Sequence, residues 1–178
     1  AAFIVEERLV PGMAVIGEQF QCDEIFVPEM LIAANAMKAS MTLLEPLIAE
    51  SGAKAPHTAL IGTVQGDLHD IGKNLVGMMW RGANFAVIDL GVNVSPKDFA
   101  AAAVEHQPDI VGMSALLTTT VPHMREAVAA VKATGVETKV LVGGAPVSAE
   151  FAAEVGADGF AEDAGAAAEV AKTLVGAA

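Results

Sequence analysis

The chain is predicted to fold as an α/β protein with a five-stranded parallel sheet, helices on both faces, and a small N-terminal helical cap. Beyond residue 56, short apolar runs alternate with stretches of helical periodicity, which is typical of a parallel sheet built from β-α units. Before residue 53, apolar residues recur at helical spacing without a strand-like run. We therefore expect a helical cap over residues 1–53 and an α/β domain over residues 57–178.

The N-terminal part is predicted to contain two helices and a turn between residues 6 and 51. Pro28 opens the second helix, because proline is tolerated in the first turn of a helix. Pro46 is expected to bend or end that helix, since a proline inside a helix removes a backbone hydrogen bond. A break is expected at Ser51–Pro56.

The rest of the chain is predicted to alternate strands with helices. Ser95 before Pro96 is a good N-cap, with proline at the first helical position. The expected strands are Ala59–Val64, Phe85–Asp89, Asp109–Met113, Lys139–Val142 and Asp158–Ala161. The expected helices are Asn74–Gly82, Pro96–His106, Val121–Ala133, Ser148–Val155 and Ala164–Val175.

Three segments with polar residues or paired glycines follow strands directly. They are Gly66–Gly72, Ser114–Thr120 and Gly143–Ala145. Ligands of parallel α/β sheets bind beyond the carboxyl ends of the strands. The three segments are therefore expected to meet at one edge of the sheet and to form one site.

Asp67 and His69 suggest a metal ligand within the first of these segments. A carboxylate near a histidine can accept one ring N–H, which fixes the tautomer and leaves the other nitrogen free for a metal. A metal site made by protein alone usually needs three or four ligands, yet no other histidine is near in sequence and the only cysteine is Cys22. A macrocycle would supply the missing ligands. The alternative is a loop histidine that is bonded to Asp67 and binds no metal.

The motifs D-x-H-x-x-G, S-x-L and G-G occur here in order, as Asp67 to Gly72, Ser114 to Leu116, and Gly143-Gly144. This arrangement resembles the cobalamin-binding domain of corrinoid proteins in methyltransferase systems, which is related to the cobalamin-binding module of methionine synthase. The resemblance extends from about Ala59 to the end and, more loosely, over the preceding helices. It implies a Rossmann-like, flavodoxin-type domain and a cap that shields the upper face of cobalt. The cap of this family usually has four helices, of which two are matched here.

By this resemblance, His69 is the lower axial ligand of cobalt in cobalamin or a related cobamide. It replaces the cofactor's own base, whose nucleotide tail then enters between sheet and helices. Gly72, Gly143 and Gly144 would leave room for the tail, because glycine lets a ligand approach the backbone closely. The alternative for Gly143 and Gly144 is that they form an ordinary turn after a strand. The residues expected to bind the cofactor are Gly66, Asp67, Leu68, His69, Asp70, Ile71, Gly72, Ser114, Leu116, Thr118, Thr120, Gly143 and Gly144.

The resemblance also implies catalytic roles for His69, Asp67 and Thr120. In the methionine synthase branch, a serine hydroxyl after the S-x-L motif completes a relay of ligand, carboxylate and hydroxyl, and Thr120 stands at that position here. Ser114 could bond to the tail base, Leu116 could pack on it, and Thr118 could reach a cofactor amide. Each of them could instead cap the helix that starts near Val121.

Several apolar side chains allow two interpretations. Met30, Met37, Met41, Phe20 and Phe26 could line the upper face of cobalt, although methionine at helical spacing is usually core. Trp80 is expected in the core. The other histidines, His57, His106 and His123, are expected at the surface or at helix ends.

The function implied by the resemblance is a methyl carrier, a subunit of a methyltransferase system and not a complete enzyme. It would pass a methyl group from a substrate-specific methyltransferase to a methylcobamide-dependent acceptor methyltransferase that acts on a folate or thiol, and a reductive activase would be a further partner. The alternatives are the small subunit of an adenosylcobalamin-dependent mutase, which normally lacks the preceding helices, and a cobalamin-binding regulatory module. A flavodoxin-type domain without corrinoid would be colourless.

Composition excludes other classes of function. The chain has 10 Lys and Arg against 22 Asp and Glu, a net charge of −12, so it is not expected to bind nucleic acid. No apolar run is long enough to cross a bilayer, and the N-terminus does not resemble a signal peptide. We therefore expect a cytoplasmic protein without a membrane partner.

Overall fold

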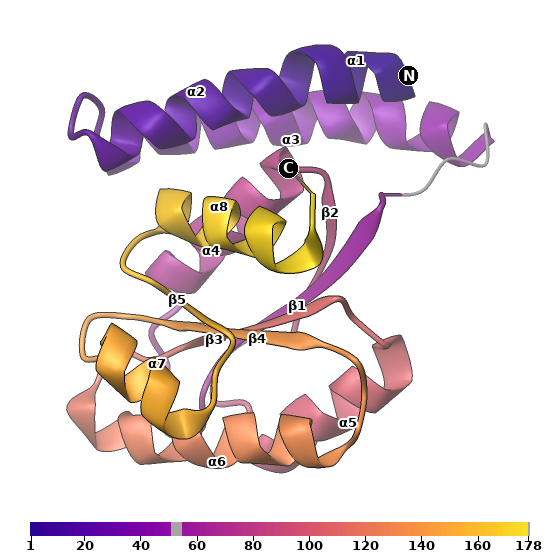
Figure 1. The fold of residues 1–178 in the computed structure, drawn as a ribbon. Coiled ribbons are helices and arrows are strands. Elements are labelled where there is room, and N and C mark those ends of the chain that lie inside the picture. The colour runs from indigo at the N-terminus through magenta and orange to yellow at the C-terminus, as the bar shows by residue number, and fades with distance from the viewer. Residues whose placement is uncertain (51–54, 178) are drawn as a thin grey trace.

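A helical hairpin lies on one helix layer of a three-layer α/β domain (Figure 1). The computed structural model describes residues 1–50 and 55–177. The first arm of the hairpin comprises α1 (Ala2–Ile4), the π-helical turn η1 (Val5–Leu9) and α2 (Val10–Gln21), and the second arm is α3 (Val27–Glu50). The predicted pair of helices with a turn is therefore present.

Pro46 does not end α3, which continues to Glu50. The expectation that the helix ends there was wrong, while a bend at Pro46 stays a prediction. A proline in the last turns of a long helix removes only one backbone hydrogen bond, so the helix can continue past it. Of the expected break, residues 51–54 lie outside the described residues, and Ala55 and Pro56 are not helical.

The sheet has five parallel strands in the order β2-β1-β3-β4-β5, as in the flavodoxin type of Rossmann-like fold. The predicted fold class is thus confirmed, and the predicted strands differ from the observed ones only at their ends. The strands are β1 (His57–Thr63), β2 (Phe85–Asp89), β3 (Ile110–Ser114), β4 (Lys139–Gly143) and β5 (Gly159–Ala161).

Helices cover both faces of the sheet, with α4 and α8 on one face and α5, α6 and α7 on the other (Figure 1). Ser95 caps α5 as predicted, because its hydroxyl accepts a hydrogen bond from the Asp98 amide. The α4 helix begins at Ile71 and not at Asn74, so Ile71 and Gly72 belong to its first turn. The helices are α4 (Ile71–Gly82), α5 (Pro96–His106), α6 (Val121–Ala133), α7 (Ala149–Val155) and α8 (Ala164–Val175).

Two apolar clusters form the core, one on each face of the sheet. Trp80, Met30 and Met37 are buried in the cluster beneath α4 and α8, and Met41 packs against it. The interpretation of these methionines as core residues is therefore confirmed. Phe26, in contrast, is 62% exposed at the turn of the hairpin.

The hairpin packs on α4 and α8 through small residues. A Cβ added to Gly165 in α8 would lie 3.0 Å from the Gly17 carbonyl oxygen in α2, and one added to Gly82 in α4 would lie 3.0 Å from Met13. Glycine therefore lets α8 approach the backbone of α2, and α4 approach the Met13 side chain, more closely than a larger residue would. This packing brings the end of α2, including Phe20, toward the edge of the sheet where the strands end.

The remaining histidines lie at element ends. His57 is the first residue of β1, where its ring stacks 5.6 Å from that of Phe85, and His106 is the last residue of α5. His123 lies in the first turn of α6. Within the described residues, every helix is too short or too polar to span a bilayer.

Candidate functional site

The register of the sheet aligns the ends of four strands in one row. Thr63 pairs with Ser114, Ser114 with Gly143, and Gly143 with Ala161. The three predicted segments therefore leave the sheet at one edge, as expected. The strand order reverses between β1 and β3, and such a reversal opens a crevice in which ligands of this fold bind.

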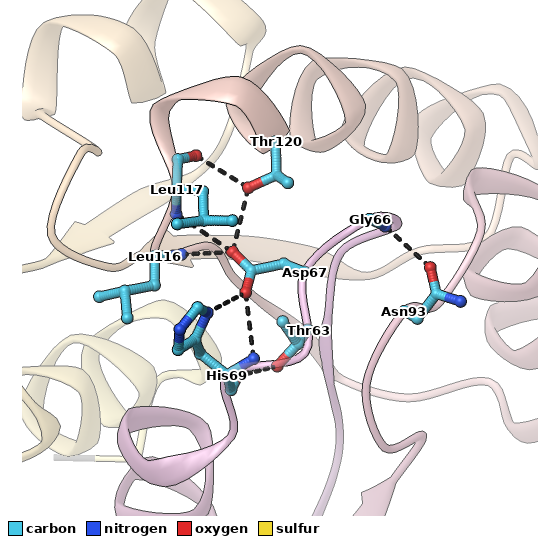
Figure 2. Close-up of polar contacts among 8 residues, drawn as sticks. All are labelled: Thr63, Gly66, Asp67, His69, Asn93, Leu116, Leu117 and Thr120. Atoms are coloured by element: carbon cyan, nitrogen blue, oxygen red, sulfur yellow. Dashed lines mark hydrogen bonds and ion pairs between the residues drawn. The ribbon is translucent and has the colours of Figure 1, made fainter.

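Asp67 is fully buried at this edge and joins two of the loops. Its Oδ1 accepts bonds from the amide of His69 at 3.1 Å and from His69 Nδ1 at 2.7 Å. Its Oδ2 accepts bonds from the amides of Leu116 and Leu117 at 2.7 and 3.2 Å, and from the Thr120 hydroxyl at 3.0 Å. Figure 2 shows that these five donors surround the carboxylate. Asp67 thus ties the loop after β1 to the loop after β3.

These donors keep Asp67 ionised. Burial by itself would raise the pKa of the carboxyl, but the hydrogen bonds from Leu116, His69 and Leu117 hold it well below its ordinary value. The carboxylate is therefore a fixed negative charge beside the His69 ring at neutral pH.

The His69 side chain is 52% exposed and is oriented from behind by Asp67. Because an ionised carboxylate can only accept, the short contact to Nδ1 means that Nδ1 carries the proton. In the neutral ring this leaves the lone pair on Nε2, which is the form of imidazole that binds a metal. The Thr63 hydroxyl donates to the His69 carbonyl at 2.9 Å and so holds the backbone as well.

Thr120 is buried, and its hydroxyl reaches two acceptors, Asp67 Oδ2 at 3.0 Å and the Leu117 carbonyl at 2.8 Å. One hydroxyl proton can serve only one of them at a time. Thr120 precedes α6 but makes no side-chain cap bond to it. Thr118 lies exposed in the 3₁₀ turn η2 (Thr118–Thr120).

Exposed apolar side chains lie on the two loops that meet at Asp67. Leu68 and Ile71 are 71% and 72% exposed on the loop after β1, and Leu116 and Leu117 are exposed on the loop after β3. On the loop after β1, the Asp70 carboxylate accepts a bond from the side-chain amide of Asn74 at 3.0 Å.

A cavity of about 210 Å³ opens beside the loop, between the sheet and helices α4 and α8. Four of the predicted residues line it: Gly72, Ser114, Gly143 and Gly144. Apolar side chains form most of its wall, among them Trp80 and Leu141, and Phe20 of α2 lies against it. The Trp80 indole N–H is already bonded to the Ala167 carbonyl at 3.0 Å. The cavity therefore suits a largely apolar group.

Packing of the protein itself requires a glycine at two of the three predicted positions but not at the third. Gly144 has φ +120, and a Cβ there would collide with the Ala115 carbonyl. A Cβ on Gly143 would come 2.8 Å from the Ala161 carbonyl oxygen. Packing of the chain itself therefore explains both. A Cβ on Gly72 would meet no atom within 4 Å outside its own turn of helix, so packing of the chain does not require this glycine, which lines the cavity.

Three contacts of the site were not foreseen from the sequence. Asn93, in the loop after β2, accepts a bond from the Gly66 amide at 2.8 Å. Lys73 is buried and forms an ion pair with Asp89 at 2.6 Å. Thr63 holds the His69 carbonyl. The loop after β2 leaves the same edge of the sheet as the other three, so the rule that selected those segments would also have selected Asn93.

The donor set fits one metal ligand and no more. Among the described residues, no cluster of three or more His, Cys, Asp and Glu side chains is placed to hold a metal ion. One exposed imidazole, exposed apolar side chains on the adjoining loops and a cavity between the sheet and α4 fit a metal bound in a macrocycle that carries a side chain of its own.

Sequence comparison gives matches along most of the chain. A family described as B12 binding domain matches residues 57–171, and a second family of that description matches residues 1–45. A corrinoid protein of Desulfitobacterium hafniense strain Y51 is 42% identical over 177 residues, covering 97% of this chain and 82% of the relative. Dimethylamine corrinoid protein 1 of Methanosarcina acetivorans is 39% identical over 175 residues, covering 97% and 82%.

Structural comparison agrees. The methanol:cobalamin methyltransferase complex MtaBC of Methanosarcina barkeri contains a chain that is similar to this one, with a TM-score of 0.85 and 27% sequence identity. The match covers 99% of this chain and 68% of the other. It includes the helical hairpin as well as the α/β domain.

Proposed function

This chain belongs to the B12-binding corrinoid proteins of methyltransferase systems, and from that premise we propose that it is a methyl carrier with His69 as the lower axial ligand of cobalt. A bound corrinoid supplies a cobalt atom that can accept and release a methyl group. The observation that carries the proposal is the 2.7 Å contact from Asp67 to His69 Nδ1, which occupies one ring nitrogen and leaves Nε2 of the half-exposed ring for a metal.

The surroundings of His69 support a base-off mode of binding. The apolar surface formed by Leu68, Ile71, Leu116 and Leu117 would contact the macrocycle, and the cavity beside Gly72 would receive the nucleotide tail. Ser114 lies at the cavity wall, where its hydroxyl would form a hydrogen bond with the base of the tail. Thr118 and Asp70 remain candidates for contacts with cofactor amides.

His69, Asp67 and Thr120 would control a proton. Because Asp67 keeps a low pKa, a proton taken up when His69 leaves the metal would stay on Nε2 of the ring, and the resulting imidazolium would be stabilised by the buried carboxylate. When Thr120 donates to Asp67 it would draw negative charge away from His69, and when it turns its proton to the Leu117 carbonyl the carboxylate would support the imidazolium more strongly. The relay would thus adjust how readily His69 is released.

The partners proposed are two methyltransferases. A substrate-specific enzyme would load the methyl group, and a methylcobamide-dependent enzyme would pass it to a folate or thiol. The similarity to the methanol:cobalamin methyltransferase complex MtaBC supports the first partner. A reductive activase would restore a cofactor that has become oxidised, because the reduced cobalt that accepts methyl groups is readily oxidised.

The proposal is tested by the ultraviolet-visible spectrum of the protein after incubation with hydroxocobalamin and desalting. Wild type is expected to retain corrin bands, and His69→Ala is expected to lose the corrin or to show a changed axial-ligand spectrum. His106→Ala is the matched control, since His106 lies at the far end of α5. A colourless, folded wild-type protein would overturn the proposal, and a His69→Ala spectrum identical to wild type would overturn the role of His69.

A further inference from the structure

The loop after β2 holds the turn from which His69 projects. The Gly66 amide donates to Asn93 Oδ1 at 2.8 Å, and the Asn93 amide donates to the Asp67 carbonyl at 3.0 Å. Figure 2 shows Asn93 on the opposite side of the turn from the Asp67 carboxylate. Asn93 thus bonds to the two residues that lead into the His69 loop.

Asn93 is itself anchored by the sheet. On either side of it, the Thr63 amide donates to the Gly91 carbonyl at 3.0 Å and the Val94 amide donates to the Thr63 carbonyl at 2.9 Å. Val64 and Val94 also form a parallel bridge beyond the ends of the strands. The position of Asn93 is therefore set by β1 and not by the loop that it holds.

The same connection holds the far end of the loop. Asp89, the last residue of β2, accepts from the buried Lys73 ammonium at 2.6 and 2.7 Å and from the Gly91 amide at 2.8 Å. Lys73 lies in the first turn of α4, just after the loop. His69 therefore lies between two points that are both fixed to the segment from Asp89 to Asn93.

The backbone conformation of Asn93 does not by itself require an asparagine side chain. Its φ is +56, a left-handed conformation in which glycine would be at least as stable. Asn93 is exposed, so core packing does not require it. What asparagine adds over glycine is the Oδ1 acceptor for Gly66.

We propose that Asn93 is a positioning residue, whose amide oxygen fixes the Gly66–Asp67 turn and thereby the direction of His69 Nε2 toward cobalt. The inference rests on the proposed function, because it assumes that His69 binds the metal. It assigns a role to the loop after β2, which carries none of the three motifs found in the sequence.

The test compares Asn93→Gly with Asn93→Asp in protein loaded with cobalamin and reduced to the cobalt(II) state. Electron paramagnetic resonance distinguishes an axial nitrogen from its absence, and so gives the ratio of His-off to His-on protein. Asn93→Gly keeps the left-handed backbone but removes the acceptor, and it is expected to raise this ratio about fivefold, the effect of about one hydrogen bond. Asn93→Asp keeps an acceptor oxygen and is expected to return the ratio to that of wild type.

Asn84→Gly is the matched control. Asn84 also has a left-handed φ, +66, but it follows α4 at the opposite end of that helix from the His69 loop. An equal shift in Asn84→Gly and Asn93→Gly, or an Asn93→Gly ratio equal to wild type, would overturn the positioning role while leaving His69 as ligand. A wild-type protein without an axial nitrogen would reject the proposed function, and this inference with it.

Discussion

Asp67 combines two tasks in one carboxylate, since Oδ1 orients the His69 ring and Oδ2 joins the loop after β3. Replacement by asparagine puts an amide N–H where an acceptor is needed and leaves buried donors unpaired. We expect Asp67→Asn to lower the free energy of unfolding of the apo-protein by about 2–4 kcal/mol, from one to two buried unsatisfied groups. Denaturant titration of wild type and Asp67→Asn measures this difference in the free energy of unfolding.

Variants of Thr120, which donates to the Asp67 carboxylate, give the matched stability comparison for Asp67→Asn. Thr120→Ser keeps the hydroxyl and should stay near wild type, whereas Thr120→Ala should lose about 1 kcal/mol. An Asp67→Asn protein as stable as wild type would show that the carboxylate does not join the loops.

Gly72 and Gly144 separate a requirement of the cofactor from a requirement of the fold. Gly72→Ala adds a methyl group where no atom outside its own turn of helix lies within 4 Å, in the first turn of α4, so the apo-protein should be unchanged or more stable by up to about 1 kcal/mol. The same methyl group intrudes on the cavity, and we expect corrinoid binding to weaken by about tenfold or more, a cost of about 1–3 kcal/mol. Spectroscopic titration with hydroxocobalamin measures the affinity.

Gly144→Ala should show the opposite pattern. Its positive φ and the collision with the Ala115 carbonyl should destabilise the apo-protein by about 3 kcal/mol. Equal behaviour of the two variants, both stable or both unstable without cofactor, would contradict the distinction.

The contact between α2 and α8 determines how the hairpin is held. Gly165→Ala would press a methyl group against the Gly17 carbonyl, so we expect it to weaken docking of α2 by about 1–2 kcal/mol despite the better helix propensity of alanine. Hydrogen exchange of the α2 amides should then become faster. The control is Gly12→Ala in α2, where an added Cβ would meet nothing within 4 Å. It should leave the exchange of the α2 amides unchanged or make it slower.

If α2 exchanges at the same rate in Gly165→Ala and wild type, close packing of glycines does not hold the hairpin in place. Faster exchange confined to α2 and α3 would instead show that the hairpin opens as a unit from α4 and α8.

The stability of the whole molecule should fall in acid through two carboxylates. For Asp158, burial would raise the pKa, but bonds from Lys132 and the Val140 amide lower it; Asp67 is lowered likewise. A carboxyl with a lower pKa in the folded state stabilises that state above its unfolded pKa and loses this contribution as the pH falls through the folded pKa. We expect the unfolding free energy of the apo-protein to be level near neutral pH and to decrease below about pH 4.

Asp158→Asn should be less stable at neutral pH and should show a shallower loss in acid. Denaturant titrations of both proteins at several pH values measure this. Equal slopes for wild type and Asp158→Asn would contradict the assignment for Asp158.

Most of the fold and the centre of the site could be predicted because both depend on local pattern. Alternation of apolar runs and helices predicted the sheet, and the place of Asp67 and His69 just after β1 predicted their pairing. The bond from Asn93 to Gly66 spans two separate loops, and the Lys73–Asp89 pair depends on register. Pro46 was expected to bend or end its helix, and of these two outcomes the end is not observed, because α3 continues to Glu50. Only the packed structure shows that Gly143 and Gly144 are needed by the chain itself.

The identity of the axial ligand is what the proposed methyl-carrier function requires most directly. We would label the protein with ¹⁵N-histidine, load it with unlabelled cobalamin, reduce it to the cobalt(II) state and record the electron paramagnetic resonance spectrum. His69 as ligand predicts that the nitrogen splitting changes from the triplet of ¹⁴N to the doublet of ¹⁵N, and that His69→Ala abolishes the doublet. A triplet that persists in the labelled protein would show that the cofactor's own base is bound, and would contradict the central claim.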